Sequence, residues 1–402
     1  MSSPQEATAN VELETILQQI EAEPSEKVRE RERKAFDEIA GPYSKRLVLF
    51  GAGPLGKTVL AGLRQAGIEP LAFADNRLAE RSSAETGRPE LMGLPVLSAA
   101  EAVKQFGKSA CFVVTIYQGT SVRRQLADLG CERVAPFAAL FWKHADVFVP
   151  QHGIELPHRM VEQFGAIRAC HAALADEKSR RELREQLRWR YWMDYSALSP
   201  ALAASETYFP LDLVAPLENE VFVDCGSYQG DTLPGFLAHW SKGFQHIFAL
   251  EPDGFNREVL ETNAKKLGVA DRVTTMPCAV GSENGRVTFA ATGTVTSHVI
   301  KGGDQGASVE CRRLDEIPWP VSPTYIKMDI EGAEPDAIVG ASGLLRRQRP
   351  VLAACTYHRS EHLWEIPNLI RSIAPEYNLF LRRYAEECWE GVCYAIPRER
   401  LL

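Results

Sequence analysis

The chain has 402 residues, of which 45% are hydrophobic and 24% charged, a balance typical of globular proteins rather than of disordered or fibrous ones. At about 100–200 residues per domain, this length predicts two or three domains. The 45 basic and 53 acidic residues give a net charge of −8, which argues against a broad surface for nucleic acid or anionic membranes. A local basic patch is compatible with this net charge.

Neither a membrane span nor an export signal is expected. No apolar run approaches the roughly 20 residues of a membrane helix, and the first residues lack the basic start and apolar stretch of a signal peptide. The nine cysteines are an odd number and form no CxxC pair, so neither a disulfide framework nor a zinc site is indicated. These features predict a cytoplasmic protein with reduced, mostly buried thiols.

The first 150 residues are expected to form two parts. In residues 1–42, apolar residues recur at helical spacing among Glu, Arg and Lys until Gly41 and Pro42 end the helical segment. Residues 43–150 alternate short apolar runs with helix-like stretches, which predicts a small Rossmann-like α/β domain. Its expected strands are 47–50, a run that ends at Asp75, 111–115 and 133–136.

Residues 151–204 are predicted to be a helical connector, and residues 205–402 a second α/β domain. The second domain has seven apolar runs, of which the first five are separated mostly by helix-length segments and the last two lie close together. This order predicts a seven-stranded, doubly wound sheet that ends in an antiparallel hairpin. The expected strands are 221–224, 246–250, 272–277, 325–328, 351–354, 379–382 and 392–396.

A glycine loop follows the first strand of the second domain. It runs from Asp224 through Gly226 and Gly230, with GxxxG spacing instead of the GxGxxG of dinucleotide sites. A carboxylate at a strand end would repel phosphate but attract an ammonium or sulfonium group. The next strand ends in Glu251, where an acidic side chain can accept both hydroxyls of a ribose. Together they favour an adenosyl ligand with a cationic tail over an ordinary strand-to-helix turn.

A third acidic group follows a later strand. The segment YIKMDIEGAE delivers Asp329 to the carboxyl end of its strand, with Glu331 and Glu334 in the turn beyond. Open α/β sheets bind their ligands at this edge. Acidic residues also cap helix N-termini, an explanation that suits Glu334 best and Asp329 least.

The motifs VFVDCGSYQGDT, ALEPD, IKMDIEGAE and CWEGVCYAIP, between about residues 205 and 397, resemble the FkbM family of S-adenosylmethionine-dependent methyltransferases. Members of this family are mostly O-methyltransferases of natural products and sugars. The resemblance implies a class I methyltransferase fold, with the cofactor across the first two strand ends. The implied cofactor-binding residues are Asp224, Gly226, Ser227, Gly230, Asp231, Glu251, Pro252, Cys278, Ala279 and Asp329.

A second glycine loop lies in the first domain. Gly51, Gly53 and Gly56 form GxGxxG between an apolar strand and a helix, and Asp75 ends the next strand. The segment resembles the small nucleotide-sugar-binding domains attached to bacterial sugar acyltransferases, which implies that these four residues bind part of the substrate. A dinucleotide site and a purely structural turn are the alternatives.

Methyl transfer to a hydroxyl needs a base near the acceptor oxygen. His358, Asp329 and Glu331 are all predicted at strand ends that face the same edge. His358 has the unperturbed pKa nearest neutrality, so we predict it as the base, oriented by Glu331, with Asp329 lining the pocket. A divalent cation held by Asp329 and Glu331 is an alternative, as is a metal pair formed by His358 and His362. No metal is predicted.

The sequence therefore predicts an S-adenosylmethionine-dependent O-methyltransferase that acts on a sugar, a glycan precursor or a related natural product. A nicotinamide-dependent oxidoreductase that uses the GAGPLG loop is one alternative, but it leaves the carboxylates of the second domain unexplained. A non-catalytic sugar-nucleotide-binding protein is the other, and the intact acidic residues speak against it.

Overall fold

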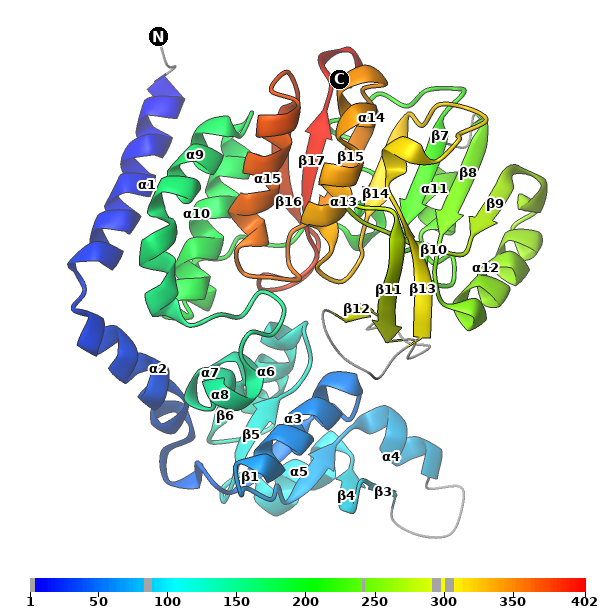
Figure 1. Ribbon diagram of the computed structural model, residues 1–402. Helices are drawn as coiled ribbons and strands as arrows, with labels where there is room; N and C mark the ends of the chain where they lie inside the picture. The colour runs from blue at the N-terminus through cyan, green and yellow to red at the C-terminus, as the bar shows by residue number, and fades with distance from the viewer. Residues whose placement is uncertain (1–3, 83–88, 241–242, 291–297, 301–306) are drawn as a thin grey trace.

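The computed structural model describes residues 4–82, 89–240, 243–290, 298–300 and 307–402. These residues form two α/β units connected by helices, with the N-terminal unit below the C-terminal unit in Figure 1. The α/β class expected from the sequence is confirmed. Within the described parts of the chain, no helix combines the length and the apolar character needed to cross a bilayer.

The N-terminal unit is built on a six-stranded sheet of order β3-β4-β2-β1-β5-β6, in which all strand pairs are parallel except β3 and β4. The strands are β1 (Leu47–Phe50), β2 (Ala72–Ala74), β3 (Glu90–Leu91), β4 (Leu94–Leu97), β5 (Cys111–Val114) and β6 (Val134–Pro136). Its helices are α3 (Pro54–Gln65), α4 (Asn76–Ser82), α5 (Ala99–Phe106), α6 (Gly119–Asp128), α7 (Phe137–Lys143) and α8 (Ala145–Phe148). The short β3–β4 pair was not predicted.

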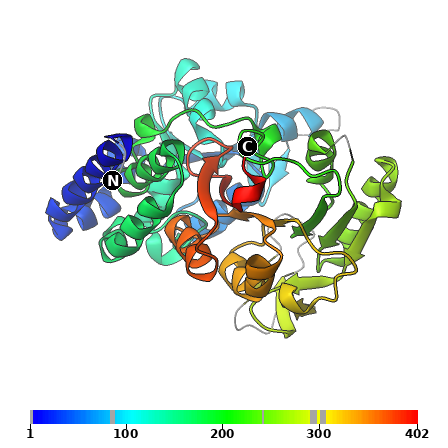
Figure 2. The same ribbon diagram turned by 90° about the horizontal axis from the view of Figure 1, so that it is seen from above.

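Helices precede and follow this unit. The predicted N-terminal helical segment contains α1 (Pro4–Ala22) and α2 (Ser25–Ala40), and the connector contains α9 (Phe164–Ala173) and α10 (Glu177–Trp192). Helix α1 packs against α10, which in turn packs against the C-terminal sheet. Viewed from above, α1, α9 and α10 lie together on one side of that sheet (Figure 2).

The C-terminal sheet has seven strands in the order β16-β17-β15-β14-β7-β8-β9. They are β7 (Val221–Cys225), β8 (His246–Leu250), β9 (Val273–Met276), β14 (Tyr325–Met328), β15 (Val351–Cys355), β16 (Asn378–Arg383) and β17 (Gly391–Ile396). All pairs are parallel except those of β17 with β15 and β16. The strand order reverses between β7 and β14, and doubly wound sheets bind ligands at such a switch point. The associated helices are α11 (Leu233–His239), α12 (Gly254–Lys266), α13 (Glu334–Gly340), α14 (Ser342–Arg347) and α15 (His362–Ile373).

A second, four-stranded sheet of order β10-β13-β11-β12 was not predicted. Its strands are β10 (Cys278–Val280), β11 (Gly285–Ala290), β12 (His298–Ile300) and β13 (Ala307–Arg312). Most side chains of β13 are exposed or half-buried. Such a strand lacks the apolar run that predicts a buried strand.

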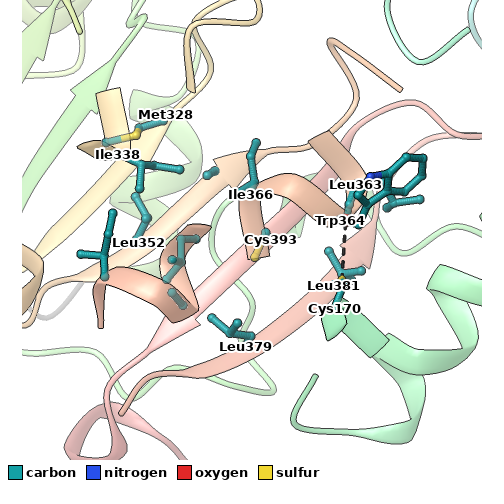
Figure 3. Close-up of a cluster of buried hydrophobic side chains, with 14 of the residues drawn as sticks. Cys170, Met328, Ile338, Leu352, Leu363, Trp364, Ile366, Leu379, Leu381 and Cys393 are labelled. Atoms are coloured by element: carbon teal, nitrogen blue, oxygen red, sulfur yellow. Dashed lines mark hydrogen bonds between the residues drawn. The ribbon is translucent and has the colours of Figure 1, made fainter. Parts of the chain in front are cut away.

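One apolar core joins the connector to the C-terminal sheet. Figure 3 shows Cys170 of α9 beside α15, where its Sγ lies 3.8 Å from the carbonyl oxygen of Leu363. Leu379 and Leu381 of β16 and Cys393 of β17 fill the same core. All nine cysteines are free and buried, in keeping with the expectation of reduced thiols.

The loop between β16 and β17, residues 384–390, enters the N-terminal unit, and we call it the insertion loop. Its Cys388 and Trp389 belong to the apolar core of that unit, where Trp389 stacks on Phe137 with ring centroids 5.8 Å apart. An ion pair of 2.7 Å joins Glu387 of the loop to Arg123 of α6. The two units therefore share part of one core.

Candidate active site

A cavity of about 320 Å³ lies at the carboxyl ends of β7, β8, β14 and β15. Seven of the predicted cofactor-binding residues line it: Gly226, Asp231, Glu251, Pro252, Cys278, Ala279 and Asp329. The other three, Asp224, Ser227 and Gly230, are buried behind its wall. The sequence thus identified much of one cavity, including segments that are more than 100 residues apart in the chain.

Gly226 brings the loops after β7 and β14 into contact. Its φ of 74° is left-handed, and a Cβ atom at this position would lie 2.0 Å from the carbonyl oxygen of Asp329. Only glycine permits such an approach without a shift of the backbone. Gly226 therefore holds the loop of Asp329 against the loop of β7.

Asp224 does not face the cavity as a free carboxylate. It is fully buried, and its Oδ1 lies 2.9 Å from Nζ of Lys327 in β14. Burial disfavours the charged ammonium, but Asp224 outweighs it and raises the pKa of Lys327. The expected attraction of Asp224 for a cationic ligand is thus already satisfied by Lys327. Asp231, which lines the cavity and is exposed, is the carboxylate of the glycine loop that a ligand can reach.

Glu251 lines the cavity at the end of β8, where the sequence predicted it. Its two carboxylate oxygens accept backbone N–H groups from Tyr228 at 3.0 Å and Asp253 at 2.8 Å, which fixes the side chain. Burial raises the pKa of Glu251 to about 7. Asn256, also in the cavity wall, has an amide nitrogen with no hydrogen-bond partner among the described residues. A ligand with hydroxyl groups or ring nitrogens would satisfy both side chains.

The carboxylates after β14 surround His358. Its Nδ1 lies 2.8 Å from Glu334, and its Nε2 lies 3.2 Å from Asp329 and 3.9 Å from Glu331. Asp329 also accepts a hydrogen bond of 2.6 Å from the hydroxyl of Tyr208. Burial opposes the charged imidazole, but Glu334 and Asp329 hold the pKa of His358 well above its usual value.

This geometry does not favour the predicted base role of His358. A base must offer an unprotonated nitrogen, whereas both ring nitrogens here face carboxylates, which raise the pKa of His358 and favour its protonated form. His358 lies between Asp329 and Glu334, where its ring contacts both carboxylates. His362 begins α15, and its Nδ1 lies 3.5 Å from the second oxygen of Glu334. Donor atoms of Asp329, Glu334 and His358 lie within 4.8 Å of one another and could hold a metal ion, a different set from the two carboxylates considered from the sequence.

Two glutamates of the cavity wall have unusual properties. Burial raises the pKa of both Glu331 and Glu390 to about 7. Both have left-handed backbones, with φ of 55° and 53°, as do three other residues of the wall: His152, Tyr208 and Tyr228. Left-handed conformations are unfavourable for residues other than glycine, and they concentrate at functional sites. Glu331 and Glu390 are therefore candidates for proton transfer near neutral pH.

The N-terminal glycine loop has a different geometry. Cβ atoms at Gly51 and Gly56 would lie 2.7 Å from Ile116 and 2.0 Å from the carbonyl of Gly51, respectively, whereas a Cβ at Gly53 would meet nothing within 4 Å. Packing therefore explains two of the glycines but not Gly53. Asp75 accepts backbone N–H groups from Ala52 and Leu78 and so organises the loop. None of these residues lines the cavity, and their role in substrate binding stays a prediction.

Several residues of the cavity wall were not found from the sequence. They are Tyr117, His152, Tyr208, Tyr228, Asn256, Lys327, Tyr357, Trp389 and Glu390. Only Lys327 carries a sequence signal, because a single lysine within an apolar parallel strand requires a buried partner. The others depend on loop conformation or on contact between the units.

Comparison with known proteins identifies a methyltransferase domain in the C-terminal part of the chain. Residues 224–388 match the family model of the methyltransferase FkbM domain. The crystal structure of methyltransferase FkbM from Methylobacillus flagellatus KT is similar over 97% of this chain and 100% of that chain, with a TM-score of 0.71 and 23% identity, which is a likeness of fold. No curated protein matches the sequence.

Other solved structures are similar over a smaller part. Precorrin-6y C5,15-methyltransferase from Geobacter metallireducens GS-15 covers 48% of this chain and 85% of its own, with a TM-score of 0.30 and 14% identity. An rRNA methylase from Streptococcus thermophilus covers 48% and 92%, with a TM-score of 0.30 and 8% identity. The family match includes the glycine loop after β7, the carboxylates Asp329, Glu331 and Glu334, and most of the insertion loop. Residues 224–388 therefore match the FkbM methyltransferase domain family.

Proposed function

We propose that this protein is an S-adenosylmethionine-dependent O-methyltransferase of class I fold that acts on a hydroxyl of a sugar, a glycan precursor or a related natural product. The observation that carries the proposal is a cavity at the β7/β14 switch point whose wall contains both Glu251 and Glu331. Glu251 is thus the candidate for ribose recognition, and Glu331 and Glu390 are the candidates for proton acceptance.

The residues of the cavity fit the cofactor. In this proposal Glu251 accepts the ribose hydroxyls, Asp231 faces the cationic tail, and Cys278 and Ala279 lie beside the adenine. Asn256, whose amide nitrogen has no partner among the described residues, supplies a donor for the same ligand. When bound, S-adenosylmethionine supplies an electrophilic methyl group on a sulfonium.

The protein's own part is to hold the acceptor and remove its proton. Alignment of the acceptor oxygen supplies most of the catalysis in such displacements, and a base adds roughly 10²–10⁴-fold. We assign the base to Glu331, because burial raises its pKa to about 7 and it lines the cavity. In this proposal His358 and Asp329 position Glu331, and the charge of His358 offsets those of the neighbouring carboxylates.

Titration calorimetry with S-adenosylhomocysteine tests the cofactor assignment. Glu251→Ala should weaken binding roughly tenfold or more, because charge-assisted hydrogen bonds contribute about 1.5–3 kcal/mol. Glu258→Ala, on the exposed face of the same region, is the control and should bind as the wild type does. Unchanged affinity in Glu251→Ala would contradict the ribose assignment, and tight binding of NADH with none of S-adenosylhomocysteine would favour the oxidoreductase alternative.

The acceptor is proposed to be a small molecule. Titration of the wild type with nucleotide sugars tests whether the N-terminal glycine loop takes part. Loss of nucleotide-sugar binding in Gly53→Val, at a position with free space around it, would support this role of the loop. Unchanged binding would indicate that the loop is only a structural turn.

A further inference from the structure

The cavity wall has two groups of side chains. Glu251, Asn256 and Cys278 follow β8 and β9, whereas Tyr357 follows β15 and Glu390 precedes β17. Because β8 and β15 lie on opposite sides of the β7/β14 pair, the two groups lie on opposite sides of the cavity. The side near β15 also receives residues from the N-terminal part of the chain.

We propose, on the basis of the function proposed above, that the insertion loop, the N-terminal unit and the first residues of the connector together build the acceptor subsite. The subsite consists of Tyr117, His152, Trp389 and Glu390, and its occupant is a neutral, hydroxylated ring such as a pyranose. The methyltransferase domain alone would lack half of this wall.

Aromatic rings form the first part of the subsite. Tyr117 lies edge-on to Trp389 with centroids 4.8 Å apart, and edge-on to His152 at 5.4 Å. Tyr117 and His152 are half-buried and line the cavity, so part of each ring faces it. Aromatic surfaces of this kind pack against the apolar face of a ring while leaving its hydroxyls free.

Two polar groups complete the subsite. Trp389 is 2% exposed and lines the cavity, yet its indole N–H has no hydrogen-bond partner among the described residues. A buried donor without a partner is unfavourable, and a ligand oxygen would satisfy it. Glu390 beside it offers carboxylate oxygens that accept hydroxyl donors. A donor and an acceptor next to aromatic rings suit a neutral polyol better than a cation, because a cation has no use for the N–H donor.

The N-terminal unit holds the insertion loop in place through its ion pair and hydrogen bonds. Glu387 accepts hydrogen bonds from Arg123 at 2.7 Å and Thr120 at 3.2 Å, and Glu386 accepts the backbone N–H of Ser121 at 3.2 Å. Glu387 is 3% exposed. Arg123 is therefore a positioning residue: it acts on the acceptor through the insertion loop.

Saturation-transfer NMR on the full chain tests the subsite, with methyl α-glucopyranoside, methyl α-mannopyranoside and methyl α-rhamnopyranoside as probes. The pyranosides should bind the wild type in the presence of S-adenosylhomocysteine. Glu390→Gln should weaken that binding roughly tenfold, whereas Glu258→Gln, at an exposed position outside the cavity wall, should not. Trp389→Phe, which removes the N–H donor together with part of the ring, should weaken it more than Trp189→Phe, the same change at a neighbouring and equally buried tryptophan outside this cavity.

Arg123 is tested by the same readout. Arg123→Ala should weaken pyranoside binding without changing the affinity for S-adenosylhomocysteine, and Arg123→Lys should restore much of it. Arg64→Ala, which removes an exposed ion pair of the same unit, is the control.

The outcomes separate this proposal from the proposed function. If S-adenosylhomocysteine does not bind the wild type, the proposed function fails. If it binds but none of the pyranosides does, or if Glu390→Gln and Trp389→Phe bind them as the wild type does, the acceptor subsite is wrong. Binding of benzylamine in place of the pyranosides would also overturn the proposal, because it would indicate a cationic acceptor.

Discussion

Replacement of Gly226 by alanine should destabilise the C-terminal unit strongly. Two costs add. The left-handed φ of 74° costs an L-residue about 1–2 kcal/mol. The new methyl group would also lie 2.0 Å from the Asp329 carbonyl oxygen and 3.1 Å from a side-chain carbon of Ile330. The carbonyl belongs to the backbone and cannot rotate away, so overpacking adds about 1–3 kcal/mol.

Gly268 provides a matched control. Its φ is 72°, but a Cβ there would meet nothing within 4 Å. Gly268→Ala should therefore cost only the conformational part, about 1–2 kcal/mol, against a total of about 2–5 kcal/mol for Gly226→Ala. Urea denaturation followed by tryptophan fluorescence compares the two midpoints. Calorimetry should show that only Gly226→Ala also loses affinity for S-adenosylhomocysteine, because the shift moves Asp329.

Equal shifts of the two midpoints would refute this reasoning. They would mean that the loops after β7 and β14 separate at little cost, so that their contact does not hold Asp329 in place. Equal midpoints together with an unchanged affinity of Gly226→Ala for S-adenosylhomocysteine would show that the glycine loop is not part of the cofactor site.

Three further outcomes are expected. Methyl-transfer activity should rise with pH through about 7 as Glu331 loses its proton, and this step should vanish in Glu331→Gln; unchanged wild-type activity in chelator would exclude the divalent-cation alternative. The free energy of unfolding should fall as pH increases above about 6.5, because the pKa of His358 is higher in the folded protein than in the unfolded chain. The stabilisation by protonated His358 is complete at pH values below its unfolded pKa, and it is lost as the pH rises through its folded pKa. His358→Gln should flatten this slope, and an unaltered slope would contradict it. Arg400→Ala should lower stability by about 3–5 kcal/mol, since it leaves Glu220, fully buried and 2.7 Å from Arg400, without its cation; a loss below about 1 kcal/mol would show that water reaches Glu220.

The seven strands of the C-terminal sheet could be predicted because their burial is visible in the sequence. Strands β7 and β15 are buried at every position, and strands covered on both faces appear as continuous apolar runs. Glu251 and Asp329 follow from the same pattern, since they are the first acidic residues after such runs. Strand β13, mostly exposed, has no comparable pattern and was missed.

Side-chain partners across the sheet were harder to predict. Asp224 was expected to meet a cationic ligand, but the register of β7 and β14 pairs it directly with Lys327. This pairing could be predicted only from the register of the two strands, in addition to their positions in the sequence. The role of His358 changed for a related reason, since its usual pKa says nothing of Glu334 and Asp329 on either side of the ring. The wall formed by Tyr117 and Glu390 depends on docking of the two units, which leaves no periodic signal.

The position of the insertion loop has a consequence for how the protein is made. A ribosome synthesises residues 43–150 well before Cys388 and Trp389, which complete the core of the N-terminal unit. The unit must therefore wait with apolar surface uncovered until the insertion loop has also emerged, a state that favours aggregation. Nascent chains that are arrested before residue 384 should bind chaperones, and those that extend past Gly391 and clear the exit tunnel should release them.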